Sequence, residues 1–209
     1  MASSTNIRRL ILSIPLLLLA IAILIPHPAS ASRRKKSTLP DLASFIESVK
    51  NGDANTLRGV YVNGIFALPV VQQPVYGSYD VSNKPDALTE FGAASAYGNV
   101  GLLAHNYLSG RYFSRMTTGL LIELVYGDGR TEYFTVTQII QYQATDPFSV
   151  QSNFIDLNTK ESLSANQLFR KVYMGPRHVT FQTCIDANGN SSWGRLFVIA
   201  VPEPVNGSN

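Results

Sequence analysis

Short apolar runs separated by turn-forming residues fill the chain from Gly52 onward, and this pattern constrains the fold more than any other feature. The runs are rich in β-branched and aromatic residues, whereas the breaks between them hold glycine, proline and asparagine. The pattern predicts strands at residues 57–62, 65–71, 98–104, 119–126, 130–141, 153–157, 177–184 and 195–201. Many short strands with few helices are typical of a β-barrel or a β-sandwich, and the pattern alone does not choose between them.

Helical spacing is confined to three short stretches. Apolar residues recur every three or four positions within residues 39–51, which predicts an amphipathic helix ahead of the strands. Shorter helices are expected near Pro85–Phe91 and from Ala165 to Val172, the latter capped by Ser164. The chain is therefore expected to be mainly β.

The N-terminus has the features of an export signal. Arg8 and Arg9 precede an apolar run from Leu10 to Ile25, and the small-residue site Ala29-Ser30-Ala31 follows it. The run is short for a membrane span of about 20 residues, and a basic stretch, Arg33–Lys36, comes next. We expect residues 1–31 to be a signal peptide or membrane anchor, residues 32–56 to be a basic linker with the helix, and the protein to act outside the cytoplasm at the cell surface.

The positive net charge does not indicate nucleic-acid binding. The chain has 17 basic and 14 acidic residues, a formal net charge of +3. Residues 1–36 contain no acidic residue and six basic ones, so the remainder has a net charge of −3. A basic surface on the folded part is not expected.

Cys184 is the chain's single cysteine, so it cannot form an intramolecular disulfide. The strand at 177–184 ends in this residue, and Arg195 opens the following strand. If the two strands pair, Cys184 and Arg195 lie side by side. A guanidinium favours the reactive thiolate and can hold an oxyanion; a core thiol with an arginine at the rim fits the spacing equally well.

A general base would come from one of three histidines. His27 lies in the export signal, and His178 is six residues from Cys184 on the same strand, about 20 Å away. His105 remains, directly after the apolar strand at 98–104. This position suits a catalytic base, and a histidine in a purely structural role fits it as well.

The ordered set of His105, Thr180-Phe181-Gln182-Thr183-Cys184 and Arg195 resembles the sortase family, in which a Thr-x-x-Thr-Cys segment supplies the nucleophile. The segment from Gly98 to Asn106 is similar to the family's "GN–apolar–GH" segment, with Ala104 in place of the glycine. The resemblance runs from about Leu57 to Pro202. It implies a closed or nearly closed sortase-like β-barrel of about eight strands, with residues 57–202 as the catalytic domain and 203–209 as a tail.

The resemblance also implies an activity. Cys184 would attack the carbonyl of a Leu-Pro-x-Thr-Gly-like sorting peptide, Arg195 would stabilise the oxyanion, and His105 would serve as acid and then base. An amine from a wall precursor or a pilin lysine would accept the acyl group, without metal or cofactor. Further substrate contacts are expected on or beside the cysteine strand, from Thr180, Gln182, Thr183 and Trp193.

Two other functions remain open at this point. The same acyl-enzyme could be resolved by water, which would make the protein a peptide hydrolase. A surface protein with the same barrel and an idle cysteine would be a non-catalytic binding module. A papain-like peptidase is disfavoured, because His105 precedes Cys184 here and the chain is rich in strands.

Overall fold

The computed structural model describes residues 39–73 and 80–204. The expected signal peptide or anchor at 1–31 and the basic stretch Arg33–Lys36 lie outside these ranges. Among the residues described, no helix is both long enough and apolar enough to cross a membrane.

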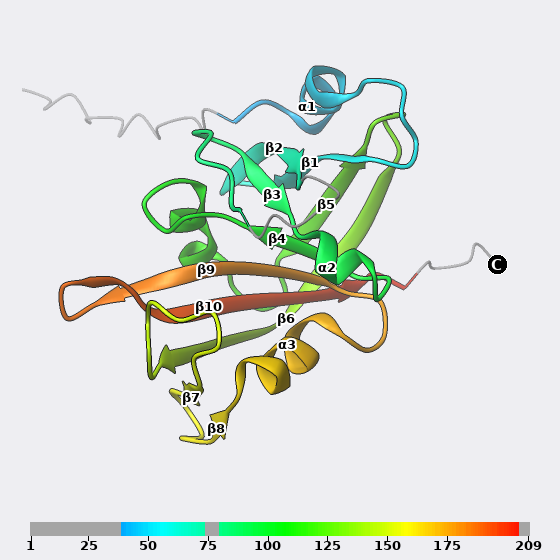
Figure 1. Ribbon diagram of the computed structural model, residues 1–209. Helices are drawn as coiled ribbons and strands as arrows, with labels where there is room; N and C mark the ends of the chain where they lie inside the picture. Colours follow the sequence, from blue (N-terminus) through cyan, green and yellow to red (C-terminus); the bar gives the residue numbers. More distant parts are fainter. Residues whose placement is uncertain (1–38, 74–79, 205–209) are drawn as a thin grey trace, which may run out of the picture. The chain divides into compact units, whose positions relative to one another are not determined.

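A single sheet forms the framework, in the strand order β10-β9-β4-β3-β2-β1-β5-β6-β7-β8. Strand β6 also pairs with β10, so the eight strands from β10 to β6 close into a barrel, and β7 and β8 continue outward from β6 (Figure 1). The strands are β1 Leu57–Val62, β2 Phe66–Gln72, β3 Leu88–Glu90, β4 Val100–Leu103, β5 Leu121–Tyr126, β6 Thr131–Ala144, β7 Phe154–Asp156, β8 Ser162–Leu163, β9 Val179–Ala187 and β10 Asn190–Pro202. The expected mainly-β barrel of about eight strands is confirmed, and the sandwich is excluded.

The barrel interior is filled by alternate residues of its strands. On β10, for example, Leu196, Val198 and Ala200 belong to the interior core, while Phe197 and Ile199 belong to a separate cluster on the outer face. Phe66, Phe113 and Phe181 pack together inside, with ring centroids 5.2–6.4 Å apart. One face of β9 and β10 therefore packs in the barrel interior, and the other packs against the outer cluster.

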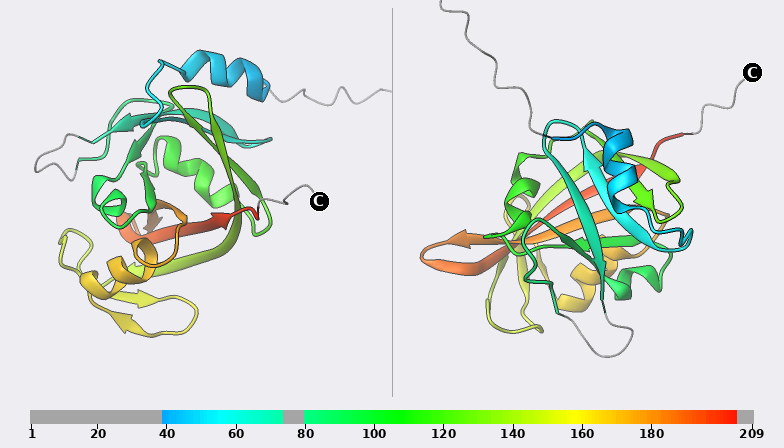
Figure 2. Two further views of the ribbon diagram at one scale, coloured as in Figure 1. Left: turned by 90° about the vertical axis from the view of Figure 1, so that its right-hand side faces the viewer. Right: turned by 90° about the horizontal axis from the view of Figure 1, so that it is seen from above.

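Two helices cover the outside of the barrel on opposite sides (Figure 2). Helix α1, Leu42–Val49, is capped by Asp41 and lays Phe45 against Gly59 of β1. Helix α3, Ala165–Tyr173, begins with a capping box formed by Ser164 and Gln167 and packs on the outer cluster of β6 and β10. Both helices were expected from the sequence, and α1 is shorter than the predicted range 39–51.

The expected helix near Pro85–Phe91 is wrong. Residues Leu88–Glu90 instead form β3, which pairs parallel with β2 and antiparallel with β4, and the short helix α2 follows at Gly92–Ser95. Leu88 and Thr89 are buried in the sheet. Tertiary pairing therefore outweighs the local helical character of this segment.

Candidate active site

Cys184 and Arg195 are direct neighbours in the sheet. They are Cα partners in the antiparallel pair of β9 with β10. Directly opposite residues of such a pair point to the same face. Because Leu196 and Thr183 face the interior, Cys184 and Arg195 lie on the outer face, where the Cys184 thiol is free and half-buried. The predicted adjacency is confirmed.

The predicted strands at 177–184 and 195–201 leave residues 185–194 as a loop between them. In the structure this loop is much shorter. Strand β9 continues beyond Cys184 to Ala187, and a tight turn at Asn188 and Gly189, both with positive φ, leads into β10. The register then shifts between Asn190 and Gly194, so residues 191–193 form a bulge opposite Asp186. Trp193 lies half-buried in this bulge, and its expected contact with the substrate stays a prediction.

The bulge holds the Arg195 side chain. Its Nη1 donates hydrogen bonds to the carbonyls of Ser192, at 3.0 Å, and Gly194, at 2.9 Å. Only one guanidinium nitrogen makes these bonds, and the planar fork offers five N–H donors in all. Arg195 is therefore anchored and retains donors for a ligand at Cys184.

His105 lies at the same end of the next strand. Strand β4 pairs parallel with β9, with Leu103 opposite Gln182, and the Ala104 N–H continues this ladder to the Gln182 carbonyl at 3.3 Å. His105 is the next residue along the chain, so it follows the end of β4 on the side of β9 where Cys184 lies. Cys184 and Arg195 are thus partners on the adjacent strands β9 and β10, and His105 follows the end of β4, the strand on the other side of β9.

The backbone around His105 is closely packed. Its carbonyl accepts hydrogen bonds from the N–H groups of Leu108 and Gly110, each at 3.0 Å, as the chain turns into the 3₁₀ helix η1, Ser109–Arg115. The preceding carbonyl, of Ala104, accepts a bond from the buried Thr183 hydroxyl at 2.8 Å. Thr183 therefore links the strand of the nucleophile to the segment that carries His105, from the face opposite Cys184.

The His105 ring has partners of its own. Its Nε2 lies 3.3 Å from the Val81 carbonyl, and it stacks on Tyr107 with a centroid separation of 5.1 Å. A carbonyl only accepts hydrogen bonds, so a hydrogen bond here requires the tautomer with the proton on Nε2. Nδ1 is then the nitrogen that remains for proton exchange.

The outer face of β9 before Cys184 is covered by α3. Thr180 is fully buried and donates to the Val172 carbonyl at 2.5 Å. Gln182 is half-buried and accepts a 2.6 Å hydrogen bond from the Tyr173 hydroxyl. Both lie on the Cys184 face of the strand. The Thr180 hydroxyl is buried and bonded to Val172, so it is not available to a bound peptide.

Two further residues lie beside Arg195 across the neighbouring strands, and the sequence did not predict their place next to the site. Tyr142 on β6 is the partner of Arg195, and Asp156 on β7 is the partner of Tyr142. Burial raises the pKa of the Tyr142 hydroxyl, although Lys171 nearby opposes this. Burial also disfavours charged Asp156, but N–H groups of Thr159 and Asn158 donate to it and hold its pKa below the ordinary value. The positions of Tyr142 and Asp156 beside Arg195 follow from the register of β10, β6 and β7, and the apolar pattern of the sequence does not determine that register.

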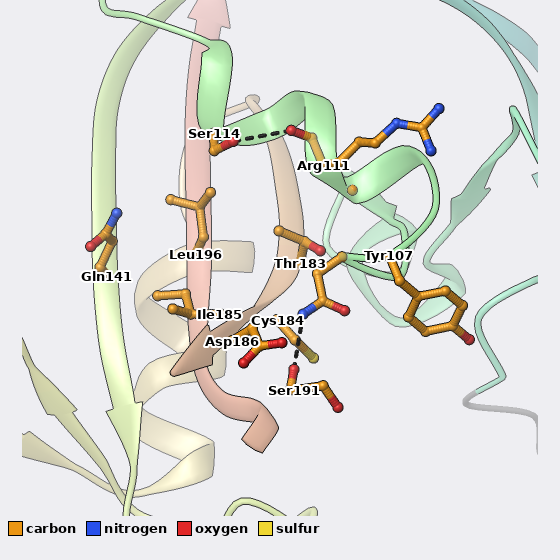
Figure 3. Close-up of a pocket in the computed structure, with 12 residues that line it drawn as sticks. Tyr107, Arg111, Ser114, Gln141, Thr183, Cys184, Ile185, Asp186, Ser191 and Leu196 are labelled. Carbon is orange, nitrogen blue, oxygen red and sulfur yellow. Dashed lines mark hydrogen bonds between the residues drawn. The ribbon is translucent and has the colours of Figure 1, made fainter. Parts of the chain in front are cut away.

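A cavity of about 410 Å³ opens beside Cys184. Figure 3 shows Cys184, Asp186 and Ser191 on one side of it, with Tyr107 and the start of η1 on another. Asn106 donates to the Ser191 carbonyl at 3.0 Å, which ties the His105 segment to the β10 bulge across the mouth of this cavity. Within residues 39–73 and 80–204 there is no group of three or more side chains suited to hold a metal ion.

Comparisons with known proteins concern the fold alone. The sequence matches no protein-family model and no curated protein. The structure is similar to sortase A of Listeria monocytogenes, with a TM-score of 0.47 and 16% identity over 72% of this chain and 88% of that one. It is also similar to sortase C1 of Streptococcus suis, with a TM-score of 0.49 and 16% identity over 79% and 80%. For sortase C-1 of Actinomyces oris the TM-score is 0.49, with 14% identity over 82% and 86%.

Proposed function

We propose that this protein is a sortase-type cysteine transpeptidase. The observation that carries the proposal is that Cys184 and Arg195 are partners on β9 and β10, while His105 directly follows the end of β4, the strand on the other side of β9. A nucleophile flanked by a proton carrier and a cationic donor is the arrangement that acyl transfer through a thioester needs. The ordered motifs of the sequence resemble those of sortases at the same three residues.

In the first half-reaction, the Cys184 thiolate attacks the carbonyl carbon of a Leu-Pro-x-Thr-Gly-like peptide. The guanidinium of Arg195 donates to the resulting oxyanion, and loss of one such donor typically costs about 3 kcal/mol. His105 gives its proton to the leaving amine as the C–N bond breaks. The product is a thioester between Cys184 and the shortened peptide.

In the second half-reaction, a primary amine attacks the thioester. Its proton passes to His105, which now acts as base, the C–S bond breaks, and Cys184 leaves as thiolate. A new amide bond joins the two substrates. Arg195 stabilises the second oxyanion as it did the first.

We assign this activity to the outer side of the membrane. The apolar run and the small-residue site in residues 1–31 support export, either by a cleaved signal or by an anchor. Sorting peptides of surface proteins are the proposed donors, and a wall precursor or a pilin lysine is the proposed acceptor. Residues 57–202 are the proposed catalytic domain.

The rate of thiol alkylation tests whether Cys184 works as a nucleophile. The chain contains no other cysteine, so iodoacetamide labelling reports this thiol alone in the folded protein. We expect labelling near neutral pH to be faster than that of free cysteine, and slower after His105→Ala or Arg195→Ala. A thiol that labels no faster than free cysteine, with no change in either variant, would favour the non-catalytic binding module.

A further inference from the structure

The cavity beside Cys184 contains a carboxylate that the chemistry above does not use. Asp186 is two residues from Cys184 on β9, so both side chains share the outer face of the sheet. Its side chain is exposed and makes no hydrogen bond or ion pair within the part of the chain described here. Asp186 is among the residues that line the cavity, together with Thr183, Ile185 and Leu196 from the interior side of the same strands. The geometry points to a second binding site: we propose that this cavity takes the acceptor amine, and that Asp186 attracts its ammonium group. This inference rests on the proposed transpeptidase function.

The position of the cavity suits an acceptor better than a donor. The outer face of β9 before Cys184 leads under α3, where Gln182 is bonded to Tyr173. Asp186 and Ser191 lie on the other side of the nucleophile, towards the β9–β10 turn (Figure 3). An amine held there approaches the thioester from the side away from Gln182. The sorting peptide, which has no required positive charge in its motif, gains nothing from a carboxylate at this place.

The other side chains that line the cavity do not form an ion pair with the Asp186 carboxylate. Arg111 also lines the cavity, but its guanidinium points away from Cys184, donates to the Tyr112 hydroxyl at 2.9 Å, and lies 3.8 Å from Asp86 (Figure 3). Asn106 is held by the Ser191 carbonyl. Arg195 lies on the same face, but its Nη1 is bonded to the Ser192 and Gly194 carbonyls, and it forms no ion pair with Asp186. Asp186 therefore presents a carboxylate without an ion-pair partner among the described residues, and such a group attracts cations.

The chemical step follows from this placement. A primary ammonium is drawn to Asp186, loses one proton to His105, and attacks the thioester carbonyl with its free electron pair. The C–N bond forms, the C–S bond breaks, and Cys184 leaves as thiolate. Asp186 binds and orients the acceptor in this scheme; it does not take the proton.

The test compares Asp186→Asn with the full-length wild-type protein, after acylation by whichever member of a Leu-Pro-x-Thr-Gly peptide library labels Cys184. Glycylglycinamide, which is largely cationic near pH 7, serves as the charged acceptor, and hydroxylamine serves as an uncharged one. Asp128→Asn is the matched control, because Asp128 is exposed in the turn at the far end of β6. Each protein is assayed for acylation rate and for partition of the thioester between amine and water.

We expect Asp186→Asn not to slow acylation, to leave hydroxylamine transfer unchanged and to raise the half-saturating glycylglycinamide concentration about three- to fivefold. Added salt should reduce that difference. Equal glycylglycinamide dependence in both proteins, or a variant defect confined to acylation, would overturn the acceptor site while leaving the transpeptidase in place. Failure of the wild type to form any acyl-enzyme would overturn both.

Discussion

Gly110 lies where a side chain would collide with the segment that carries His105. A Cβ at this position would meet the Thr183 hydroxyl, the His105 carbonyl at 2.7 Å and the Ala104 carbonyl at 2.8 Å. Two of these atoms belong to the backbone, so they cannot move aside as a flexible side chain could. Gly110→Ala must displace η1 or the His105 turn.

We expect Gly110→Ala to lower the free energy of unfolding by about 1–3 kcal/mol and to slow alkylation of Cys184 in the protein that remains folded. Urea denaturation and iodoacetamide labelling measure the two effects. Gly92→Ala is the matched control, since its nearest neighbour is the Gln73 side chain at 4.0 Å. Wild-type labelling and stability in Gly110→Ala would show that this contact does not position His105.

At the residue scale, the sequence predicted the adjacency of Cys184 and Arg195 better than the surroundings of the two residues. Cys184 and Arg195 could be paired because each stands at the end of a predicted apolar run, although β9 continues to Ala187 and β10 begins at Asn190. The burial of Thr180 and its hydrogen bond to Val172 could not be predicted, because they depend on where α3 packs on the sheet. Asp186 was not singled out, because the sequence indicated a loop where β9 continues.

At the scale of elements, α3 is fastened at both ends. Its first turn is held by the capping box of Ser164 and Gln167. Near its last turn, the Val172 carbonyl accepts bonds from Thr180, at 2.5 Å, and from Nε2 of His178, at 2.9 Å. The buried His178 therefore has a structural role.

Removal of the cap should loosen the start of this helix. Ser164→Ala is expected to cost about 1 kcal/mol, because the Gln167 N–H loses its acceptor. Amide exchange should accelerate in residues 165–168 and change little in β9. Ser162→Ala, an exposed serine in β8, is the control. Unchanged exchange at the start of α3 would contradict the assigned role of the capping box.

The turn from β7 to β8 should depend on pH through Asp156. Burial disfavours its charge, but N–H donors from Thr159 and Asn158 outweigh burial, so its pKa lies below the ordinary value of 3.8. A lowered pKa means that the charged form stabilises the fold above about pH 4, and that this contribution is lost as pH falls through the folded pKa. We expect urea midpoints between pH 5 and pH 2 to fall less steeply in Asp156→Asn than in wild type. Asp146→Asn, in the neighbouring loop, controls for loss of one carboxylate; identical slopes in wild type and Asp156→Asn would contradict the assignment.

Most strands could be predicted because each is bounded by local turn signals, as at Gly127-Asp128-Gly129 between β5 and β6. The errors fall where long-range pairing decides the structure. Strand β3 has only three residues and is defined by its neighbours β2 and β4. The segment at 185–194 is rich in turn-forming residues, yet only Asn188 and Gly189 form the turn, and the rest joins the two strands and the bulge.

At the scale of the whole barrel, closure is what creates the site. Strands β6 and β10 pair along most of their length, from Gly194 opposite Gln143 to Pro202 opposite Phe134. This pairing fixes β10, and through it β9 and β4, so that three residues distant in sequence share one end of the barrel. At the other end of β6, Glu132 accepts bonds from Arg130, at 2.9 Å, and Arg177, at 2.6 Å, which joins the β5–β6 hairpin to the start of β9.

In the proposed reaction, Cys184 forms a thioester with a peptide at this end of the barrel. The most direct measurement is the intact mass of the full chain after incubation with a Leu-Pro-x-Thr-Gly-type peptide library, without and with a small primary amine. The account predicts a mass shift on the wild type equal to the acyl fragment of one peptide. It also predicts no shift in Cys184→Ala, and loss of the shift with release of an amide product when the amine is added. Release of the free acid alone would indicate a hydrolase, and no adduct from any peptide would contradict the account.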